Sequence, residues 1–105
     1  MLARITTFHA QEGRLDDVLA IIQGEISQAV RAKPGCLGVT ILVDRSDHRG
    51  MFIAYWDSEE RITELENSGF WESQVAKGVF LIAEVPTREV YDVVSVEGIT
   101  LPAGI

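Results

Sequence analysis

Aromatic rings and guanidinium groups are the side chains of this sequence best suited to binding chemistry. Trp56 ends a strand-like segment, and Phe70 and Trp71 begin a helix-like one. Rings of this kind stack on planar ligands, and a guanidinium such as that of Arg4 binds carboxylates and phenolates. Each residue also has a simpler interpretation, because large aromatics first of all fill cores and Arg4 can pair with an acidic residue near a helix end.

Histidine, cysteine and clustered carboxylates are the other candidates for chemistry. His9 ends a strand pattern and could act as a base, although a histidine there is more often a partly exposed hydrogen-bonding group, and His48 lies in a polar turn. Cys36 is the only cysteine, and its place where a turn meets a strand suits a small buried thiol. The acidic runs at 16–17 and 57–60 stand in the first turns of predicted helices, where the helix dipole explains them. The sequence therefore predicts no metal site and identifies no catalytic residue.

Length and composition narrow the class of protein. A chain of 105 residues with 47% hydrophobic and 24% charged residues predicts a single globular domain over 1–105. The formal net charge of -7, with lysines and arginines scattered singly, argues against nucleic acid as a partner. The segment Met1-Leu2-Ala3-Arg4 runs straight into a strand pattern, and no apolar run approaches membrane-spanning length. We therefore expect a cytoplasmic protein that does not enter membranes.

The candidate side chains are positioned by alternating and helical patterns. Leu2–His9 alternates as a strand, which places Arg4, Thr6 and Phe8 on one face and His9 on the other.

A long helix is predicted to follow this strand. It begins at Leu15, carries one apolar stripe and is stopped by Pro34-Gly35. Gly24 lies opposite the stripe, where it costs about 1 kcal/mol relative to alanine.

The remaining elements complete the order β-α-β-β-α-β, in which the second helix has two pieces. This order predicts an α+β fold of the ferredoxin-like, split βαβ type with an antiparallel four-stranded sheet. The segments are strands at Leu37–Val43, Met51–Trp56 and Arg88–Ser95, a polar hairpin connection at Asp44–Gly50, a helix with Asp57 as N-cap and Glu60 three residues later, a helix from near Ser68 that Gly78 could split and Pro86 closes, and a tail from Val96 to Ile105.

Both faces of the predicted sheet are apolar, although helices on one side can cover only one of them. In Met51–Trp56, Ile53 and Tyr55 alternate with Phe52 and Trp56. Neither face of this strand therefore carries the polar residues expected of a face exposed to water. The simplest cover for the second face is the same face of another copy, which predicts a homodimer. We take Ile41, in the preceding strand, as an interface residue.

Three segments of the chain resemble the antibiotic biosynthesis monooxygenase family. They are Glu12-Gly13 after the first strand, Lys33-Pro34-Gly35-Cys36-Leu37-Gly38 after the long helix, and Tyr55-Trp56-Asp57-Ser58-Glu59-Glu60 leading to Phe70-Trp71. The resemblance covers nearly the whole chain and implies a dimeric αβ-barrel, in which two subunits place their sheets face to face with the helices outside.

The same resemblance implies an activity. Enzymatic members oxidise aromatic polyketides or quinols with molecular oxygen, typically without metal or flavin, and some members degrade haem. Their substrate lies between sheet and helices within each subunit. By this resemblance we expect no cofactor and a site for a small aromatic or quinone-like ligand lined by Arg4, Thr6, Phe8, Trp56, Phe70 and Trp71.

The chain departs from two enzymatic patterns of the family. Haem-degrading relatives use an Asn, a Trp and a His where this chain is judged to have Thr6, Glu64 and Gln74, so haem degradation is not expected. Quinol-oxidising relatives commonly carry a His in the helix after the Trp-x-Ser exit, where this chain has Leu65. Two hypotheses therefore stand: a cofactor-independent monooxygenase, and a non-catalytic ligand-binding or stress-related dimer of the same fold.

Overall fold

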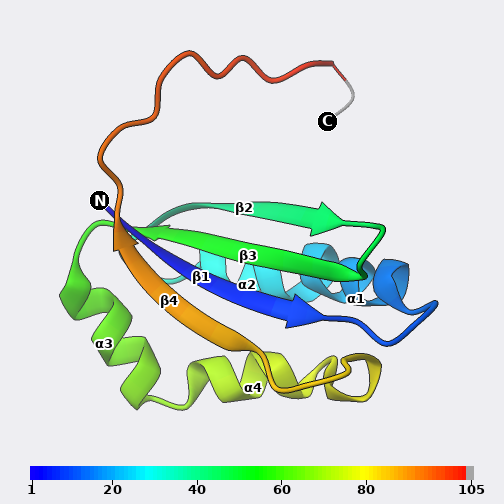
Figure 1. The fold of residues 1–105 in the computed structure, drawn as a ribbon. Helices are drawn as coiled ribbons and strands as arrows, with labels where there is room; N and C mark the ends of the chain where they lie inside the picture. Colours follow the sequence, from blue (N-terminus) through cyan, green and yellow to red (C-terminus); the bar gives the residue numbers. More distant parts are fainter. Residues whose placement is uncertain (104–105) are drawn as a thin grey trace.

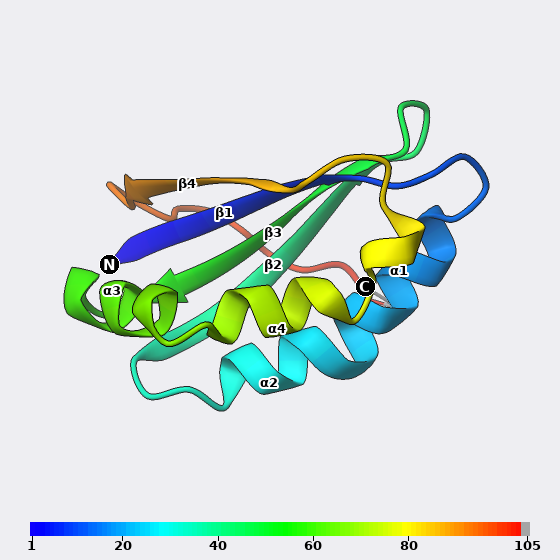
Figure 2. The same ribbon diagram turned by 90° about the horizontal axis from the view of Figure 1, so that it is seen from below.

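The computed structural model describes residues 1–103, in which four strands form one antiparallel sheet of order β2-β3-β1-β4. The helices lie on one face of this sheet (Figures 1 and 2). This is the ferredoxin-like α+β arrangement that the sequence predicted. The elements are β1 (Leu2–His9), α1 (Leu15–Ile21), α2 (Ser27–Arg31), β2 (Cys36–Asp44), β3 (Arg49–Trp56), α3 (Glu59–Asn67), α4 (Phe70–Ala76) and β4 (Thr87–Asp92).

The long first helix contains a widened turn that its periodicity did not predict. α1 and α2 are joined without a break by a π-helical turn, Ile22–Ile26. Gly24 lies in this turn, and a Cβ built on it would meet nothing within 4 Å. π-Helical turns are rare and occur often beside functional sites. Ile22 and Ile26 from this turn face the cavity described below.

Several predicted boundaries are corrected by the structure. The N-cap of α3 is Ser58 rather than Asp57, because the Ser58 hydroxyl accepts a hydrogen bond from the Arg61 N–H at 3.4 Å. β4 ends at Asp92, three residues earlier than Ser95. Gly78 separates α4 from a short 3-10 turn, Val79–Leu81, as the sequence suggested.

The inner face of the sheet, which the helices cover, carries the core. Trp56 is completely buried there, and Phe8 and Phe52 are nearly so. The prediction for Ile41 is wrong, because Ile41 is paired with Phe52 and packs against this core. A bulge between Cys36 and Gly38 interrupts the alternation at the start of β2, and Leu37 within it is exposed.

The outer face of the sheet carries no helix. Leu42, Met51 and Tyr91 are all about half exposed on it, and Ile53 and Ala3 lie between them. The face is therefore apolar over three neighbouring strands, as the predicted alternation required. Among residues 1–103, no helix is long and apolar enough to cross a membrane.

Close packing of Phe8 over Gly50 fixes the wall of the inner face. The two residues are direct partners in the β1–β3 ladder, and Gly50 is buried. A Cβ on Gly50 would overlap the Phe8 ring and come within 2.9 Å of the Leu42 carbonyl oxygen. Glycine at this position therefore lets the Phe8 ring lie flat across the neighbouring strand.

Replacing Gly50 by alanine should destabilise the protein by roughly 1–3 kcal/mol, because the ring and the β2 backbone must both move. Gly24→Ala is the matched control, since a Cβ there meets nothing and alanine favours helix, so stability should stay level or rise by up to about 1 kcal/mol. Urea unfolding monitored by circular dichroism measures both. Equal effects of the two substitutions would contradict the packing argument.

Candidate functional site

A cavity of about 150 Å³ lies between the inner face of the sheet and the helices. Most of its wall is apolar, and its polar side chains come from β1, α4 and β4. The apolar wall includes Phe8, Phe52, Val18, Ile22, Trp71 and Ile82. The polar lining residues are Arg4, Thr6, Gln74 and Arg88.

The structure brings four of the six predicted binding residues to this cavity: Arg4, Thr6, Phe8 and Trp71. The other two support Trp71 instead of lining the space. Trp56 is completely buried and meets Trp71 edge to face at 6.4 Å between ring centroids. Phe70 is partly buried and packs against the other side at 5.3 Å, also edge to face. The Trp71 ring is therefore held in one orientation by its two aromatic neighbours.

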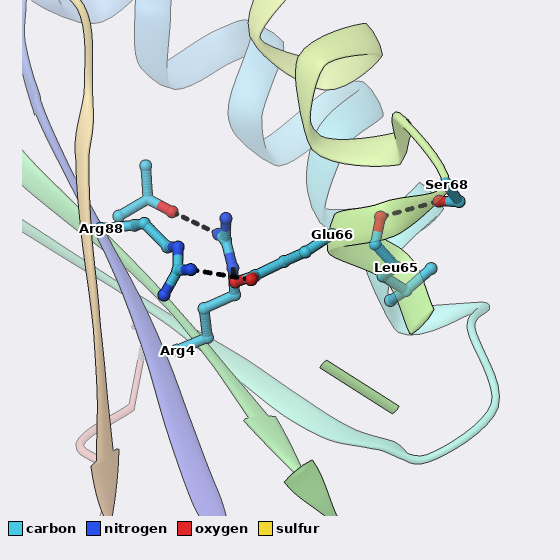
Figure 3. A network of polar contacts seen from close by, with 6 residues as sticks. Arg4, Leu65, Glu66, Ser68 and Arg88 are labelled. Carbon is cyan, nitrogen blue, oxygen red and sulfur yellow. Dashed lines mark hydrogen bonds and ion pairs between the residues drawn. The ribbon is translucent and has the colours of Figure 1, made fainter. Parts of the chain in front are cut away.

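The guanidinium of Arg4 is buried beside this ring. Its central carbon lies 3.8 Å from the Trp71 ring centroid. Nε donates to the Glu66 Oε1 at 3.2 Å, and Nη1 donates to the Thr6 hydroxyl at 2.9 Å (Figure 3). Burial lowers the pKa of Arg4 from its ordinary value, and the hydrogen bond and charge of Glu66 oppose that effect. The group remains cationic because an arginine in a protein does not lose its proton.

Glu66 joins a second arginine to the first. Its Oε2 accepts a hydrogen bond from Arg88 Nη2 at 2.8 Å, so the carboxylate lies between two guanidinium groups (Figure 3). Arg88 faces the cavity because it is the ladder partner of Thr6 in the neighbouring strand. Glu72 contributes a further negative charge, close enough to oppose the lowering of the Arg4 pKa. The two guanidinium groups are the feature of the cavity lining that can bind an anion.

Sequence reasoning missed Glu66 and did not place Arg88 in the site. A signal for Glu66 was present, because it follows Ile62 by four residues and so shares the buried face of α3. The signal for Arg88 was its strand alternation with Val90, which faces the same way. What the sequence does not contain is the proximity of α3 to β1 and β4, which only the packed fold defines.

Both tryptophans carry an unmatched indole N–H. The Nε1 atoms of Trp56 and Trp71 are buried without a hydrogen-bond partner among residues 1–103. A buried donor without an acceptor costs roughly 1–3 kcal/mol, which phenylalanine at either position would not incur.

The other candidate residues lie away from the cavity. His9 is on the outer face, with Nδ1 3.4 Å from the Glu84 carboxylate. His48 occupies the β2–β3 turn with φ of 55°, and Cys36 is half-buried in β2. Glu64 is exposed. Within the described chain, the titratable groups that line the cavity are thus the two arginines.

Tyr55 and Tyr91 both lie on the outer face of the sheet. Tyr55 accepts a hydrogen bond from the Thr40 hydroxyl at 3.2 Å. Tyr91 donates to the Glu89 carboxylate, and this hydrogen bond raises the pKa of Tyr91. Neither tyrosine can therefore reach a ligand in the inner cavity.

A four-stranded antiparallel sheet with helices on one face and an apolar cavity beneath them defines the class, an α+β domain of the ferredoxin-like type. The profile of the antibiotic biosynthesis monooxygenase family matches residues 1–76, and the chain belongs to that family. The segment from the end of α4 through β4 lies outside the matched range.

Known structures share the fold. A crystal structure of an antibiotic biosynthesis monooxygenase superposes with a TM-score of 0.71 at 22% identity, covering 90% of this chain and all (100%) of that one. The protein Rv0793 of Mycobacterium tuberculosis superposes at 0.71 with 14% identity, covering 92% and 98%. PA3566 of Pseudomonas aeruginosa superposes at 0.69 with 19% identity, covering 90% and 94%. At these identities the likeness shows the fold alone.

One similar curated sequence is an uncharacterised protein of Mycobacterium tuberculosis, Rv2557, which is 34% identical over 58 residues. The match spans 55% of this chain and 26% of that protein. The matched segment therefore corresponds to about a quarter of that relative's length.

Removing the charge of Glu66 should weaken the fold, because Arg4 would remain buried without a counter-ion. We expect Glu66→Gln to lower the free energy of unfolding by roughly 1–3 kcal/mol. Glu64→Gln is the matched control, because Glu64 faces solvent on the same helix and pairs only with exposed Arg61, so its effect should stay within about 0.5 kcal/mol. Thermal and urea unfolding measure both. If the two variants lose equal stability, the bridge is not a specific support.

Proposed function

We propose that this protein is a cofactor-independent monooxygenase that oxidises a compact, acidic aromatic or quinone-like compound with molecular oxygen. The observation that carries the proposal is the apolar cavity whose polar lining includes the guanidinium groups of Arg4 and Arg88. Membership of the monooxygenase family supports it. The 105 residues are proposed to act as one domain of that family.

The reaction needs an electron-rich anion that reduces oxygen directly. A new carbon–oxygen bond forms at the ring carbon, the O–O bond breaks, and the second oxygen leaves as water with two hydrogens from the substrate. Arg4 and Arg88 would stabilise the phenolate or enolate from which the electrons come. They would also lower the pKa of the bound phenol, so the anion forms without a histidine base.

The size of the cavity limits the ligand. Its volume of about 150 Å³ is below the roughly 300–1,000 Å³ usual for drug-sized ligands. Dry cavities of about this size hold a single aromatic ring. We therefore expect one- and two-ring phenols or quinols to bind more tightly than three-ring compounds. Trp71 would contact the ring of the ligand while the arginines bind its oxygen.

The second candidate function is a ligand-binding or stress-related protein without catalysis. The observation that favours it is that no histidine or cysteine lines the cavity within residues 1–103. Binding without oxygen consumption would distinguish it from the enzyme.

Binding and turnover can be measured together. We expect juglone and menadione to quench tryptophan fluorescence saturably, and an anthrone to do so more weakly because of its third ring. Arg4→Ala should weaken the acidic phenol juglone about tenfold or more and leave neutral menadione nearly unchanged. Glu66→Gln should tighten juglone binding, because it raises the net positive charge of the cluster.

Oxygen uptake separates the two functions, with the quinol forms of juglone and menadione as substrates. Uptake with product formation supports the monooxygenase, and saturable binding without uptake supports the binding protein. Trp71→Ala tests the ring contact, with the stability of the variant measured in parallel because loss of this side chain can cost roughly 3–5 kcal/mol. Absence of quenching by every compound, together with a destabilised Trp71 variant, would mean that the aromatics only fill the core.

We further propose that two copies pack their outer sheet faces together. The support is the apolar outer face formed by β2, β3 and β1, which the helices leave uncovered. A soluble protein rarely leaves such a face in water, and a twofold axis lets one surface cover itself. Burial of about 800 Å² per copy would be of standard size for a stable dimer.

Leu42→Asp should therefore weaken self-association at least tenfold, because it places a charge in the apolar contact. Gln28→Asp is the control, since it adds the same charge on the exposed side of α2. Sedimentation equilibrium at micromolar concentration measures both. A single 11.6 kDa species for the unmodified protein would refute the dimer.

A further inference from the structure

The cavity is polar at one end and apolar at the other. At the start of α4, Trp71 lies beside Arg4 of β1. Beyond the end of α4, Ile82 pairs with Ala10, which follows β1, so the two elements run in the same direction (Figure 2). The two guanidinium groups share one carboxylate at the Arg4 end, whereas Phe8 and Ile82 line the other end. A ligand whose oxygen is bound by the arginines therefore extends toward the C-terminal end of α4.

Gly78 lies in the wall of the apolar end. At about 1.5 Å per residue, the chain from Trp71 to Gly78 spans roughly 10 Å, which is more than one aromatic ring requires. A Cβ built on Gly78 would meet the Cδ1 of Ile21 at 3.9 Å, an ordinary van der Waals distance. Ile21 lines the same cavity from α1. The missing side chain of Gly78 therefore leaves space inside the cavity.

Neither backbone conformation nor crowding requires glycine at position 78. The residue follows Lys77, the C-cap of α4, where a glycine usually ends a helix by adopting the left-handed conformation. The φ of Gly78 is instead -126°, which residues with side chains also adopt. Its N–H donates to the Val75 carbonyl at 3.1 Å, and its carbonyl accepts from the Leu81 N–H at 2.9 Å. Alanine would keep both hydrogen bonds, so helix termination does not account for this glycine, whereas the cavity does.

We propose that Gly78 determines the size of the ligand, and that the ligand is a fused two-ring phenol or quinol whose second ring lies against Gly78. The inference rests on the ligand site of the proposed function. With the ligand oxygen bound by Arg4, the first ring lies beside Trp71 and the second lies between Gly78 and Ile21. The cavity of about 150 Å³ leaves little spare room around two rings. One side chain at position 78 is therefore enough to exclude the second ring.

The polar residue of α4 in the cavity wall does not oppose an apolar second ring. Gln74 Oε1 accepts a hydrogen bond from Lys77 Nζ at 2.8 Å, and Gln74 Nε2 donates to the Ser73 hydroxyl at 3.3 Å. Both heavy atoms of the amide thus have partners within the chain. A hydrocarbon ring can occupy this end of the cavity without breaking either hydrogen bond.

Substitutions at Gly78 should change the preference between ligands of different size. The probes are juglone, a phenol of two fused rings, and 2-nitrophenol, an acidic phenol of one ring, and quenching of tryptophan fluorescence measures both. We expect Gly78→Val to raise the Kd of juglone at least tenfold and that of 2-nitrophenol less than about twofold. Gly78→Ala adds one carbon atom and should raise the Kd of juglone about threefold.

Two further variants show whether the effect comes from lost space. Ile21→Val removes the Cδ1 atom opposite position 78, so in combination with Gly78→Ala it should return the Kd of juglone to within about twofold of the unmodified protein. Gly24→Ala is the control, because Gly24 is exposed and does not line the cavity, and it should leave both Kd values unchanged. Thermal unfolding shows which variants are folded, and if Gly78→Val is not, the alanine variants decide by the same comparison.

The outcomes separate this inference from the proposed function. Equal weakening of both phenols, or an unchanged Kd of juglone in the folded Gly78 variants, overturns the role of Gly78 and leaves the ligand site standing. Failure of both phenols to bind the unmodified protein overturns the ligand site and this inference with it.

Discussion

The buried positive charge of Arg4 constrains the arrangement of the residues around it on the inner face of the sheet. A guanidinium in an apolar layer is tolerated only when it is paired and hydrogen-bonded. Glu66 supplies the charge, Thr6 accepts one N–H, and Trp71 offers its ring face. These partners come from α3, from the same strand and from α4, so one side chain ties the two C-terminal helices to β1. The position of those helices determines the shape of the cavity.

The same cluster explains why the cavity has a polar part at all. Glu66 bridges the two arginines, and Arg88 is half exposed toward solvent. A core selected for stability alone would carry apolar side chains here, since well-packed apolar replacements for a buried ion pair are often as stable or more so. The unmatched indole N–H groups of Trp56 and Trp71 point the same way. Residues that reduce stability in one place, around one cavity, are typical of a ligand site.

Patterns of local sequence predicted the fold well and the site in part. Strand alternation placed Arg4, Thr6 and Phe8 on one face of β1, and that face lines the cavity. The choice of which face of β2 points outward was wrong, because Ile41 is paired with Phe52 and packs against the core. The bridge from Arg4 through Glu66 to Arg88 joins residues that are 62 and 22 positions apart. No local pattern encodes such contacts, because they depend on the packing of α3 under β1 and β4.

β1 connects the two apolar surfaces of the molecule. Its inward residues Arg4, Thr6 and Phe8 line the cavity, and its alternate residues, among them Ala3 and Ile5, form the middle of the outer face. A strand is only one residue thick, so packing a second copy against the outer side restrains the backbone that carries the inner side chains. Self-association would thus hold Arg4 and Phe8 in place without contributing any atom to the cavity. The proposed assembly and the proposed ligand binding would therefore use opposite faces of the same strand, β1.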